Sequence, residues 1–412
     1  MKKNISFFTK IILIFSNLLF FACDIPLLND QKSNSDNELL LGLALLSQRS
    51  SYNWNLPPGF PEPRVPAENP MSIEKVELGR HLFYDRRLSQ DETKACSSCH
   101  FQSLAFSDGK ALPSGITGQV HPRNAQHLTN AAYHSRLTWN NPNLRTLEQQ
   151  ARVPMFGESP IELGLQDESF LSKLKLDSLY PELFNQAFGG GDGSITEQNV
   201  RFALASFQRS MISGNSPFDR AQNGNRTAIT PSAARGASFF NSEIAECFHC
   251  HGGFNFTDTN LHGTQAEEEF AYHNNGTHTV AYYNSLGDIH KEGLKEITLQ
   301  DSDQGKFRAP SLRNVAVTFP YMHDGSIMCD NNQNPNHPDG IANGASLSTC
   351  ARNALGKVVD QYSSGGAAHP AKDGTLIRPF PIQPSEKEDL INFLLSLTDD
   401  EFLRNPKFSN PR

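Results

Sequence analysis

The sequence Cys-x-x-Cys-His occurs twice in this chain, as Cys96-Ser97-Ser98-Cys99-His100 and as Cys247-Phe248-His249-Cys250-His251. In this motif the two thiols bond the vinyl groups of a c-type haem, and the adjacent imidazole becomes a ligand of the iron. Zinc binding through Cys-x-x-Cys would need a second such pair close by, and each motif here ends directly in histidine. The two copies therefore predict two covalently bound haem c groups.

The surroundings of the two motifs also repeat. A Gly-x-x-x-Phe pattern precedes each motif, a Phe-Ser/Thr-Asp pattern follows it, and an Ala-x-x-Leu-x-Asn-x-Ala pattern comes later. The matching segments are Gly79–Phe83 and Gly236–Phe240, Phe106–Asp108 and Phe256–Asp258, Ala125–Ala132 and Ala309–Ala316. Their common order predicts two homologous haem domains, which we expect at residues 54–214 and 215–411.

The secondary-structure signals predict a mainly α fold with long loops and little β structure. Apolar residues recur at helical spacing from Val200 to Met211, behind Thr196 as a helix cap. Ser385 and Glu388 have the spacing of a capping box before a second apolar stripe. Loops rich in Gly, Pro and Asn lie between these stretches, as is typical of small domains in which a covalently held haem supplies much of the core.

The N-terminus has the features of a bacterial lipoprotein signal at residues 1–23. Two lysines precede an apolar run, Ile11–Ala22, that is too short to span a bilayer, and Cys23 follows it. We expect lipidation of Cys23, with an ordinary secretory signal cleaved nearby as the alternative. Residues 24–53 then form a tether. The chain is expected on the periplasmic side of a bacterial membrane, held there by the lipid alone.

The net charge limits the kinds of partner that the chain can bind, and the cysteines bear on the compartment in which it works. The formal net charge is −8 and no basic stripe is present, which argues against nucleic acid as a partner. Of the seven cysteines, four belong to the haem motifs and Cys23 to the signal, so Cys329 and Cys350 are left. In an oxidising compartment these two are expected to form a disulfide, the alternative being free thiols.

Further motifs resemble those of the bacterial dihaem cytochrome c peroxidases of the MauG superfamily. They are Pro310–Asn314, Pro320–Gly325 and Trp139, and the resemblance covers roughly residues 54–400. Within the superfamily, four stretches are most similar to the MbnH-type dihaem enzymes, namely Leu56–Arg64, Leu144–Gln150, Pro154–Glu158 and Glu246–Phe256.

The resemblance implies an exported enzyme that reacts with hydrogen peroxide. In MbnH- and MauG-like enzymes a high-valent dihaem state then oxidises a partner protein, at tryptophan in the MbnH type. One alternative is a cytochrome c peroxidase that reduces peroxide to water with electrons from a small cytochrome or cupredoxin. A weaker alternative is a dihaem electron carrier without catalytic activity.

The resemblance also implies that the first haem is the peroxidatic one, with His100 as the proximal ligand. It implies that Glu162 lies over the open face of this haem, with Gln150 beside it. Cleavage of the O–O bond needs such a base to take a proton from one oxygen and return it to the other. His121 is a second candidate for this role. A glutamate at the solvated end of a helix is the alternative interpretation of Glu162.

On the second haem, which relays electrons, the resemblance implies Tyr362 as the sixth ligand of the iron. A phenolate stabilises oxidised iron better than a thioether does, so the potential falls. Met322 and Met328 are rival ligands, and a tyrosine that only packs on a helix is the remaining alternative. His323 is expected near the edge of this haem, where it either tunes the haem through a hydrogen bond or only holds its loop.

Two further features follow from the resemblance. Trp139 is expected between the haems, where an easily oxidised indole passes electrons by hopping; a buried core tryptophan is the alternative. One calcium ion is expected between the domains, held by the side chain of Asn130 and by the main-chain oxygens of Thr318 and Pro320, since calcium prefers oxygen ligands.

Overall fold

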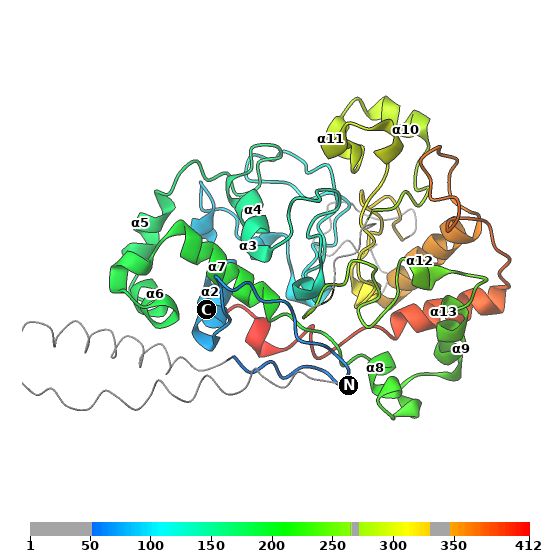
Figure 1. Cartoon of the computed structure of the whole chain (residues 1–412), viewed down its shortest axis with the longest axis horizontal. Coiled ribbons are helices and arrows are strands. Elements are labelled where there is room, and N and C mark those ends of the chain that lie inside the picture. The colour runs from blue at the N-terminus through cyan, green and yellow to red at the C-terminus, as the bar shows by residue number, and fades with distance from the viewer. Residues whose placement is uncertain (1–51, 264, 266–271, 330–346) are drawn as a thin grey trace, which may run out of the picture. The chain divides into compact units, whose positions relative to one another are not determined.

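The computed structural model describes residues 52–263, 265, 272–329 and 347–412, and this part of the chain is mainly helical (Figure 1). Its β structure is limited to isolated bridges such as Pro63–His262 and His134–Asn260. The prediction of a mainly α fold with long loops is confirmed. Among the described residues, no helix is both long enough and apolar enough to cross a membrane.

The first half of the described chain is built around a pair of packed helices, α2 and α7. Its helices are α2 (Ile73–Phe83), α3 (Leu147–Gln150), α4 (Arg152–Phe156), α5 (Phe170–Lys175), α6 (Tyr180–Phe188) and α7 (Glu197–Arg209). Helix α7 begins where it was predicted, because the Thr196 side chain accepts a hydrogen bond from the Asn199 amide. The helices pack so closely that a Cβ on Gly79 would lie 1.9 Å from the Ala203 carbonyl oxygen.

The second half contains a matching pair, α9 and α13. Its helices are α8 (Pro217–Gln222), α9 (Pro231–Phe240), α10 (Val280–Leu286), α11 (Lys295–Thr298), α12 (Leu347–Ser363) and α13 (Pro384–Leu395). A Cβ on Gly236 would lie 1.9 Å from the Asp389 carbonyl oxygen. The glycine of each Gly-x-x-x-Phe pattern therefore marks the point where two helix backbones come together.

The predicted capping box at Ser385 and Glu388 is wrong. Helix α13 begins at Pro384, which suits a first helical position because proline has no N–H to leave unsatisfied. The cap is Gln383, whose backbone N–H donates to the Glu386 carboxylate at 2.8 Å. Ser385 is therefore already inside the first turn.

The sequence repeat corresponds to a repeat of backbone geometry. Each haem motif begins with a 3-10 turn. Phe106 and Phe256, which follow the two motifs, have positive φ values of 64° and 50°. Asn130 and Asn314 have φ values of 57° and 61°, and each precedes another 3-10 turn. Residues other than glycine seldom have a positive φ. Its recurrence at matching positions therefore supports a common origin for the two halves.

The described chain has two large hydrophobic cores, one for each half. Residues 51–412 nevertheless form one compact unit, so the division into two haem domains stays a prediction. The end of the chain returns to the first half, where Phe402 and Phe408 pack in the first core (Figure 1).

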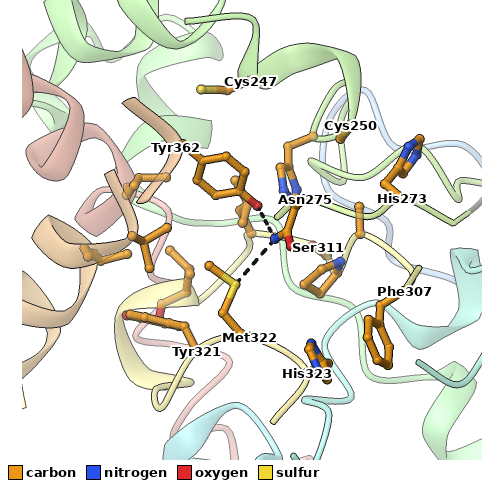
Figure 2. Close-up of a pocket in the computed structure, with 18 of the residues that line it drawn as sticks. Cys247, Cys250, His273, Asn275, Phe307, Ser311, Tyr321, Met322, His323 and Tyr362 are labelled. Carbon is orange, nitrogen blue, oxygen red and sulfur yellow. Dashed lines mark hydrogen bonds between the residues drawn. The ribbon is translucent and has the colours of Figure 1, made fainter. Parts of the chain in front are cut away.

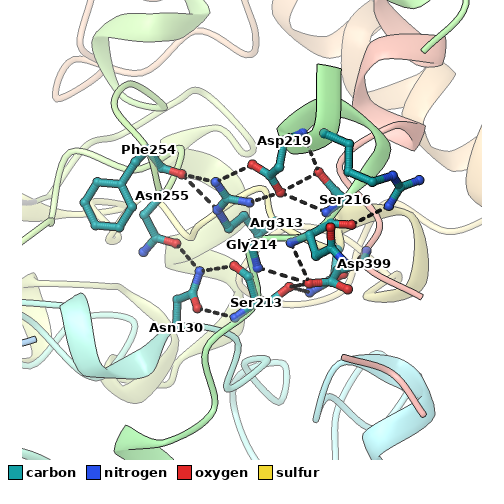
Figure 3. A network of polar contacts seen from close by, with 12 residues as sticks. Asn130, Ser213, Gly214, Ser216, Asp219, Phe254, Asn255, Arg313 and Asp399 are labelled. Carbon is teal, nitrogen blue, oxygen red and sulfur yellow. Dashed lines mark hydrogen bonds and ion pairs between the residues drawn. The ribbon is translucent and has the colours of Figure 1, made fainter. Parts of the chain in front are cut away.

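A buried polar network joins the two halves (Figure 3). The Asn130 side chain makes two hydrogen bonds to the backbone of Ser213, at 2.7 and 2.9 Å. The repeat-related Asn314 accepts a hydrogen bond from the Asp399 amide at 2.7 Å. The Asp399 carboxylate in turn accepts from the Ser213 hydroxyl and the Gly214 amide, both at 3.0 Å. The two asparagines thus hold the segment that connects the halves.

Candidate active site

The histidine of each haem motif is oriented by a backbone carbonyl. Nδ1 of His100 lies 2.6 Å from the Phe106 oxygen, and Nδ1 of His251 lies 3.2 Å from the Phe256 oxygen. Burial lowers the pKa of both imidazoles, which favours the neutral form. A neutral ring that donates from Nδ1 has its lone pair on Nε2, as an iron ligand requires.

Each motif opens on a large cavity. The first haem cavity is lined by Cys96, Cys99 and His100 and encloses about 1500 Å³, part of it open to solvent. The second haem cavity is lined by the corresponding residues of the second motif and encloses about 1660 Å³, again partly open. Two thiols and one correctly oriented imidazole at the wall of a large cavity fit a haem c in each half.

A buried cation between the cavities also fits haem. Arg308 lines both cavities and is 4% exposed, and burial lowers its pKa to about 10, so it remains charged at neutral pH. Its guanidinium contacts His134 and Gln126, but its Nε has no hydrogen-bond partner among the described residues. The propionates of a haem are anionic groups that such a cation would bind.

The peroxidatic residues that were predicted lie around the first haem cavity. Glu162, Gln150 and His121 all line it, together with His100. Nε2 of His121 is 3.6 Å from the Glu162 carboxylate, which is too long for a direct hydrogen bond. The carbonyl oxygen of Glu162 accepts a hydrogen bond from the Ile116 amide at 2.9 Å, so the backbone that carries this carboxylate is fixed.

The rival ligands of the second haem lie close together in the second haem cavity (Figure 2). The side-chain amide of Asn275 donates to the Tyr362 hydroxyl at 3.0 Å and lies 3.5 Å from the Met322 sulfur. Burial raises the pKa of the Tyr362 phenol to about 12. Met328 is not among the residues that line this cavity.

Trp139 lies between the two cavities and lines both of them. It is 8% exposed, and its indole N–H donates to the Asn124 carbonyl at 2.8 Å. His323 lines the second haem cavity with its ring stacked on Phe307, and its carbonyl oxygen accepts from the Asn124 amide at 2.7 Å. Their roles, an electron bridge for Trp139 and a position at the haem edge for His323, stay predictions.

Several polar residues of the cavities escaped sequence analysis. His127 lines both cavities, and burial lowers its pKa to about 4. His273 lines the second haem cavity, between the carboxylates of Asp258 (2.5 Å) and Asp373 (3.0 Å). Their positions in the repeat could have indicated them. His127 lies inside the repeated Ala-x-x-Leu-x-Asn-x-Ala segment, and Asp258 ends the repeated Phe-Thr-Asp segment.

The remaining predicted residues are placed as follows. Cys329 and Cys350 form a disulfide. Thr318 and Pro320 line the second haem cavity, whereas the fully buried Asn130 belongs to the polar network of Figure 3. Cys23, with the predicted signal and nearly all of the tether, lies outside the described residues.

The chain is similar to known dihaem enzymes over most of its length. Residues 73–227 match the family described as di-haem cytochrome c peroxidase. The cytochrome-c peroxidase IdrP1 of Pseudomonas sp. (strain SCT) is 32% identical over 396 residues, which cover 91% of this chain and 94% of the relative. The methylamine utilization protein MauG of Methylophilus methylotrophus is 36% identical over 298 residues, covering 70% of this chain and 81% of MauG.

Solved structures agree with these relatives. A MauG-like protein associated with microbial copper homeostasis superposes with a TM-score of 0.76 at 38% identity, covering 87% of this chain and 99% of that one. The dihaem peroxidase BthA of Burkholderia thailandensis shares the fold, with a TM-score of 0.57 at 18% identity. The paired haem motifs, the two cavities and these similarities together show that the chain belongs to the di-haem cytochrome c peroxidase and MauG family, whose members act on peroxide through two haem c groups.

Proposed function

We propose that this dihaem peroxidase uses hydrogen peroxide to oxidise a tryptophan on an exported partner protein. The observation that carries the proposal is the Tyr362 hydroxyl, which lies in the second haem cavity under a hydrogen bond from Asn275. When bound, the haem pair supplies the reaction with peroxide and stores the oxidising equivalents. The 38% identity to a MauG-like structure over almost all of that chain supports this choice.

Asn275 prepares Tyr362 for an anionic role. The amide donates to the phenol oxygen, and a donor at that atom favours the phenolate over the neutral phenol. Burial acts in the opposite direction, because it raises the phenol pKa to about 12. The phenol therefore keeps its proton until a positive charge is bound next to it. Tyr362 then serves as the anionic ligand of the second haem.

Around the first haem cavity, Glu162 is the proton carrier. Its carboxylate takes a proton from one peroxide oxygen and returns it to the other, which leaves as water. His121 lies 3.6 Å from this carboxylate, so a small side-chain rotation would bring the two into a hydrogen bond through which they can exchange a proton. Gln150 orients peroxide from the same cavity wall. Overall, peroxide takes up two electrons and two protons and gives two waters.

Trp139 and Arg308 connect the two halves of the site. Trp139 lines both cavities, and the hydrogen bond to Asn124 fixes the orientation of its indole, which suits an aromatic group that passes electrons between them. Arg308 is the buried cation that lines both cavities, and it would bind the haem propionates. Both residues keep the redox path short and shielded from water.

A cytochrome c peroxidase that draws electrons from a small soluble donor is the second candidate. Its supporting observation is Met322, whose sulfur lies 3.5 Å from the same Asn275 amide. In that case Met322 would hold the second haem, which would supply a site for electrons from a redox protein, and no tryptophan would be oxidised.

A matched pair of variants separates the two candidates. We expect Tyr362→Phe to change the optical and EPR spectra of the second haem in the oxidised protein, and Met322→Leu to leave them as in the wild type. The reverse result would make Met322 the ligand and favour the second candidate. Adding stoichiometric peroxide to the fully oxidised protein is an independent test. A reaction without prior reduction would support partner oxidation. No reaction in either redox state would show that the protein is an electron carrier without catalytic activity.

Two further features of the chain are part of the proposal. One calcium ion is held by Asn130, Thr318 and Pro320, and the Asn130 oxygen that accepts from the Ser213 amide has a second lone pair for it. Metal analysis after EGTA dialysis should give one calcium lost per chain, and no calcium before dialysis would refute the site.

The chain is exported and lipid-anchored through Cys23, which mass spectrometry of the mature N-terminus tests.

A further inference from the structure

A continuous series of aromatic rings leads away from the second haem cavity. Phe307 and His323 line the cavity, and their rings are stacked with centroids 3.6 Å apart and planes 12° apart. Behind His323 lie two more rings, His278 at 5.8 Å and Tyr283 at 6.4 Å. Tyr283 is 1% exposed, so this part of the series is shielded from water.

The series ends at the surface with Tyr282 on helix α10. The Tyr282 ring stacks on His278 at 3.7 Å, with planes 20° apart, and lies 5.7 Å from the Tyr283 ring. Tyr282 is 37% exposed. Two routes therefore connect His323 with the surface, one through His278 and one through Tyr283, and no step between ring centroids exceeds 6.4 Å.

A proton acceptor accompanies the surface end of the series. A tyrosine that loses an electron also has to release its phenolic proton. The pKa of the Tyr282 phenol is raised, first by burial and then by the negative charge and hydrogen bonding of Asp324. The same carboxylate lies 2.6 Å from Nε2 of His278. Asp324 is thus close enough to receive the proton of Tyr282, and His278 holds this carboxylate in place.

The segment that carries Tyr282 has several exposed apolar side chains. Of the eleven exposed large hydrophobic side chains in the described part of the chain, four fall within residues 282–299: Tyr282, Ile289, Ile297 and Leu299. Helices α10 and α11, which carry or flank these residues, lie next to each other at the edge of the molecule (Figure 1). A concentration of exposed apolar side chains on one lobe is typical of a surface that contacts another protein.

We propose that Tyr282 is the surface end of an electron relay that serves the second haem and that takes its electrons from the oxidisable tryptophan of the exported partner protein. This inference rests on the proposed partner oxidation. Tyr282 would give one electron inward through His278 or Tyr283 and past His323 to the second haem, once peroxide has oxidised the haem pair, and its phenolic proton would pass to Asp324. The partner indole then returns one electron to Tyr282, and the proton comes back from Asp324. Two such passes supply the two electrons that one peroxide takes up, and the two protons that it also takes up are balanced by the two that the oxidised indole releases to solvent.

Three variants of the full-length, haem-loaded protein test the relay. Tyr282→Phe keeps the ring stacked on His278 but removes the O–H, whereas Tyr282→Trp keeps an oxidisable ring. The matched control is Tyr52→Phe, because Tyr52 is a partly buried tyrosine whose ring contacts Trp54 and no ring of the relay. The probe is a synthetic apolar peptide with one tryptophan, and its oxidation is followed by mass spectrometry after peroxide is added.

We expect Tyr282→Phe to slow peptide oxidation at least about ten-fold, and Tyr282→Trp and Tyr52→Phe to stay within about two-fold of the wild type. EPR of protein with ring-deuterated tyrosine should give a tyrosyl radical that deuteration narrows and that Tyr282→Phe removes. Loss of the ferric EPR signals is recorded in parallel. If these signals persist in the wild type after peroxide, the proposed function itself fails. If they disappear but Tyr282→Phe keeps the radical and the wild-type rate, only the relay is refuted.

Discussion

At the scale of the single residue, His323 is an imidazole that the fold keeps neutral. It is 6% exposed, and burial lowers its pKa to about 4, helped by the nearby charges of His278 and Arg123 and opposed by Asp324. In the unfolded chain a histidine titrates near pH 6.5. Between about pH 6.5 and 4 the unfolded state therefore binds a proton that the folded state does not, so the free energy of unfolding falls as the pH falls.

We expect His323→Phe, which keeps a ring stacked on Phe307, to reduce this loss of stability. The wild type should lose up to about 3 kcal/mol more than the variant between pH 7 and pH 4.5, as the size of the pKa shift implies. Urea unfolding of both proteins at the two pH values measures the difference. Equal losses in the two proteins would show that His323 titrates normally in the folded state.

Glu162 is the residue on which peroxide chemistry depends in the proposed function. Glu162→Gln keeps the size of the side chain but removes the proton carrier, so the reaction with peroxide should slow by about 10² to 10⁴. Stopped-flow absorbance at the main haem band measures the rate. Glu158→Gln is the matched control, because Glu158 lies in the same loop, is exposed and does not line the first haem cavity. A similar slowing in both variants would mean that Glu162 acts only through the loop.

Whether a residue of the site could be predicted from the sequence depends on how local the pattern is that identifies it. The haem cysteines and histidines were predictable because the chemistry fixes their spacing within five residues. Glu162 and Tyr362 were predictable only through resemblance to a family. Arg308 could not be predicted, because its significance comes from burial between two cavities, which depends on packing between distant segments.

At the scale of the element, the closest approach of two helices depends on one glycine in each half. In Gly236→Ala the new Cβ would lie 1.9 Å from the Asp389 carbonyl oxygen, so α9 and α13 would have to move apart. We expect a loss of about 1–3 kcal/mol in the free energy of unfolding, the usual cost of overpacking. Chemical denaturation followed by circular dichroism measures it.

Gly356→Ala in α12 is the matched control for this variant. Its Cβ would meet nothing closer than 3.6 Å, at Lys387 Cε, so the alanine fits and stabilises the helix by about 0.5–1 kcal/mol. If Gly236→Ala were as stable as Gly356→Ala, the close crossing of α9 and α13 would not constrain the fold.

Helices whose ends are set by neighbouring residues in the sequence could be predicted. Helix α7 followed from its apolar spacing and from Thr196 as its cap. The prediction failed at the start of α13, where Pro384 fixed the first turn ahead of the Ser385 signal. The positive φ values of Phe106 and Phe256 had no sequence signal at all, because residues other than glycine enter this region only when the surrounding structure imposes it.

At the scale of the whole molecule, Asp399 links the segment between the halves to the end of the chain. Asp399→Ala would leave the Ser213 hydroxyl and the Gly214 amide without their acceptor, so we expect a loss of about 2–4 kcal/mol. Asp400→Ala is the matched control, because Asp400 is exposed and its ion pair with Arg404, four residues further on, contributes less than about 1 kcal/mol. Urea unfolding followed at the haem absorbance measures both; a loss no larger in Asp399→Ala would show that the network is dispensable.

The overall organisation could be predicted only in part. The repeat predicted two haem-binding halves, and the structure contains two cavities with matching histidines. The boundaries at residues 54–214 and 215–411 remain a prediction, and no local signal indicated that Phe402 and Phe408 pack in the first core. Contacts between such distant segments follow from the tertiary fold, which a single sequence does not reveal.

The return of the chain end to the first core has a consequence for how the protein matures. Phe402 and Phe408 belong to the first hydrophobic core, so that core cannot close until residues 402–408 have joined the folding chain. If the chain folded before haem was attached, burial would raise the pKa of the Cys96 thiol to about 12 and that of the Cys99 thiol to about 11, which would suppress the reactive thiolate. The enzymes that attach haem therefore have a limited interval in which to act, after the motif emerges and before the C-terminus arrives.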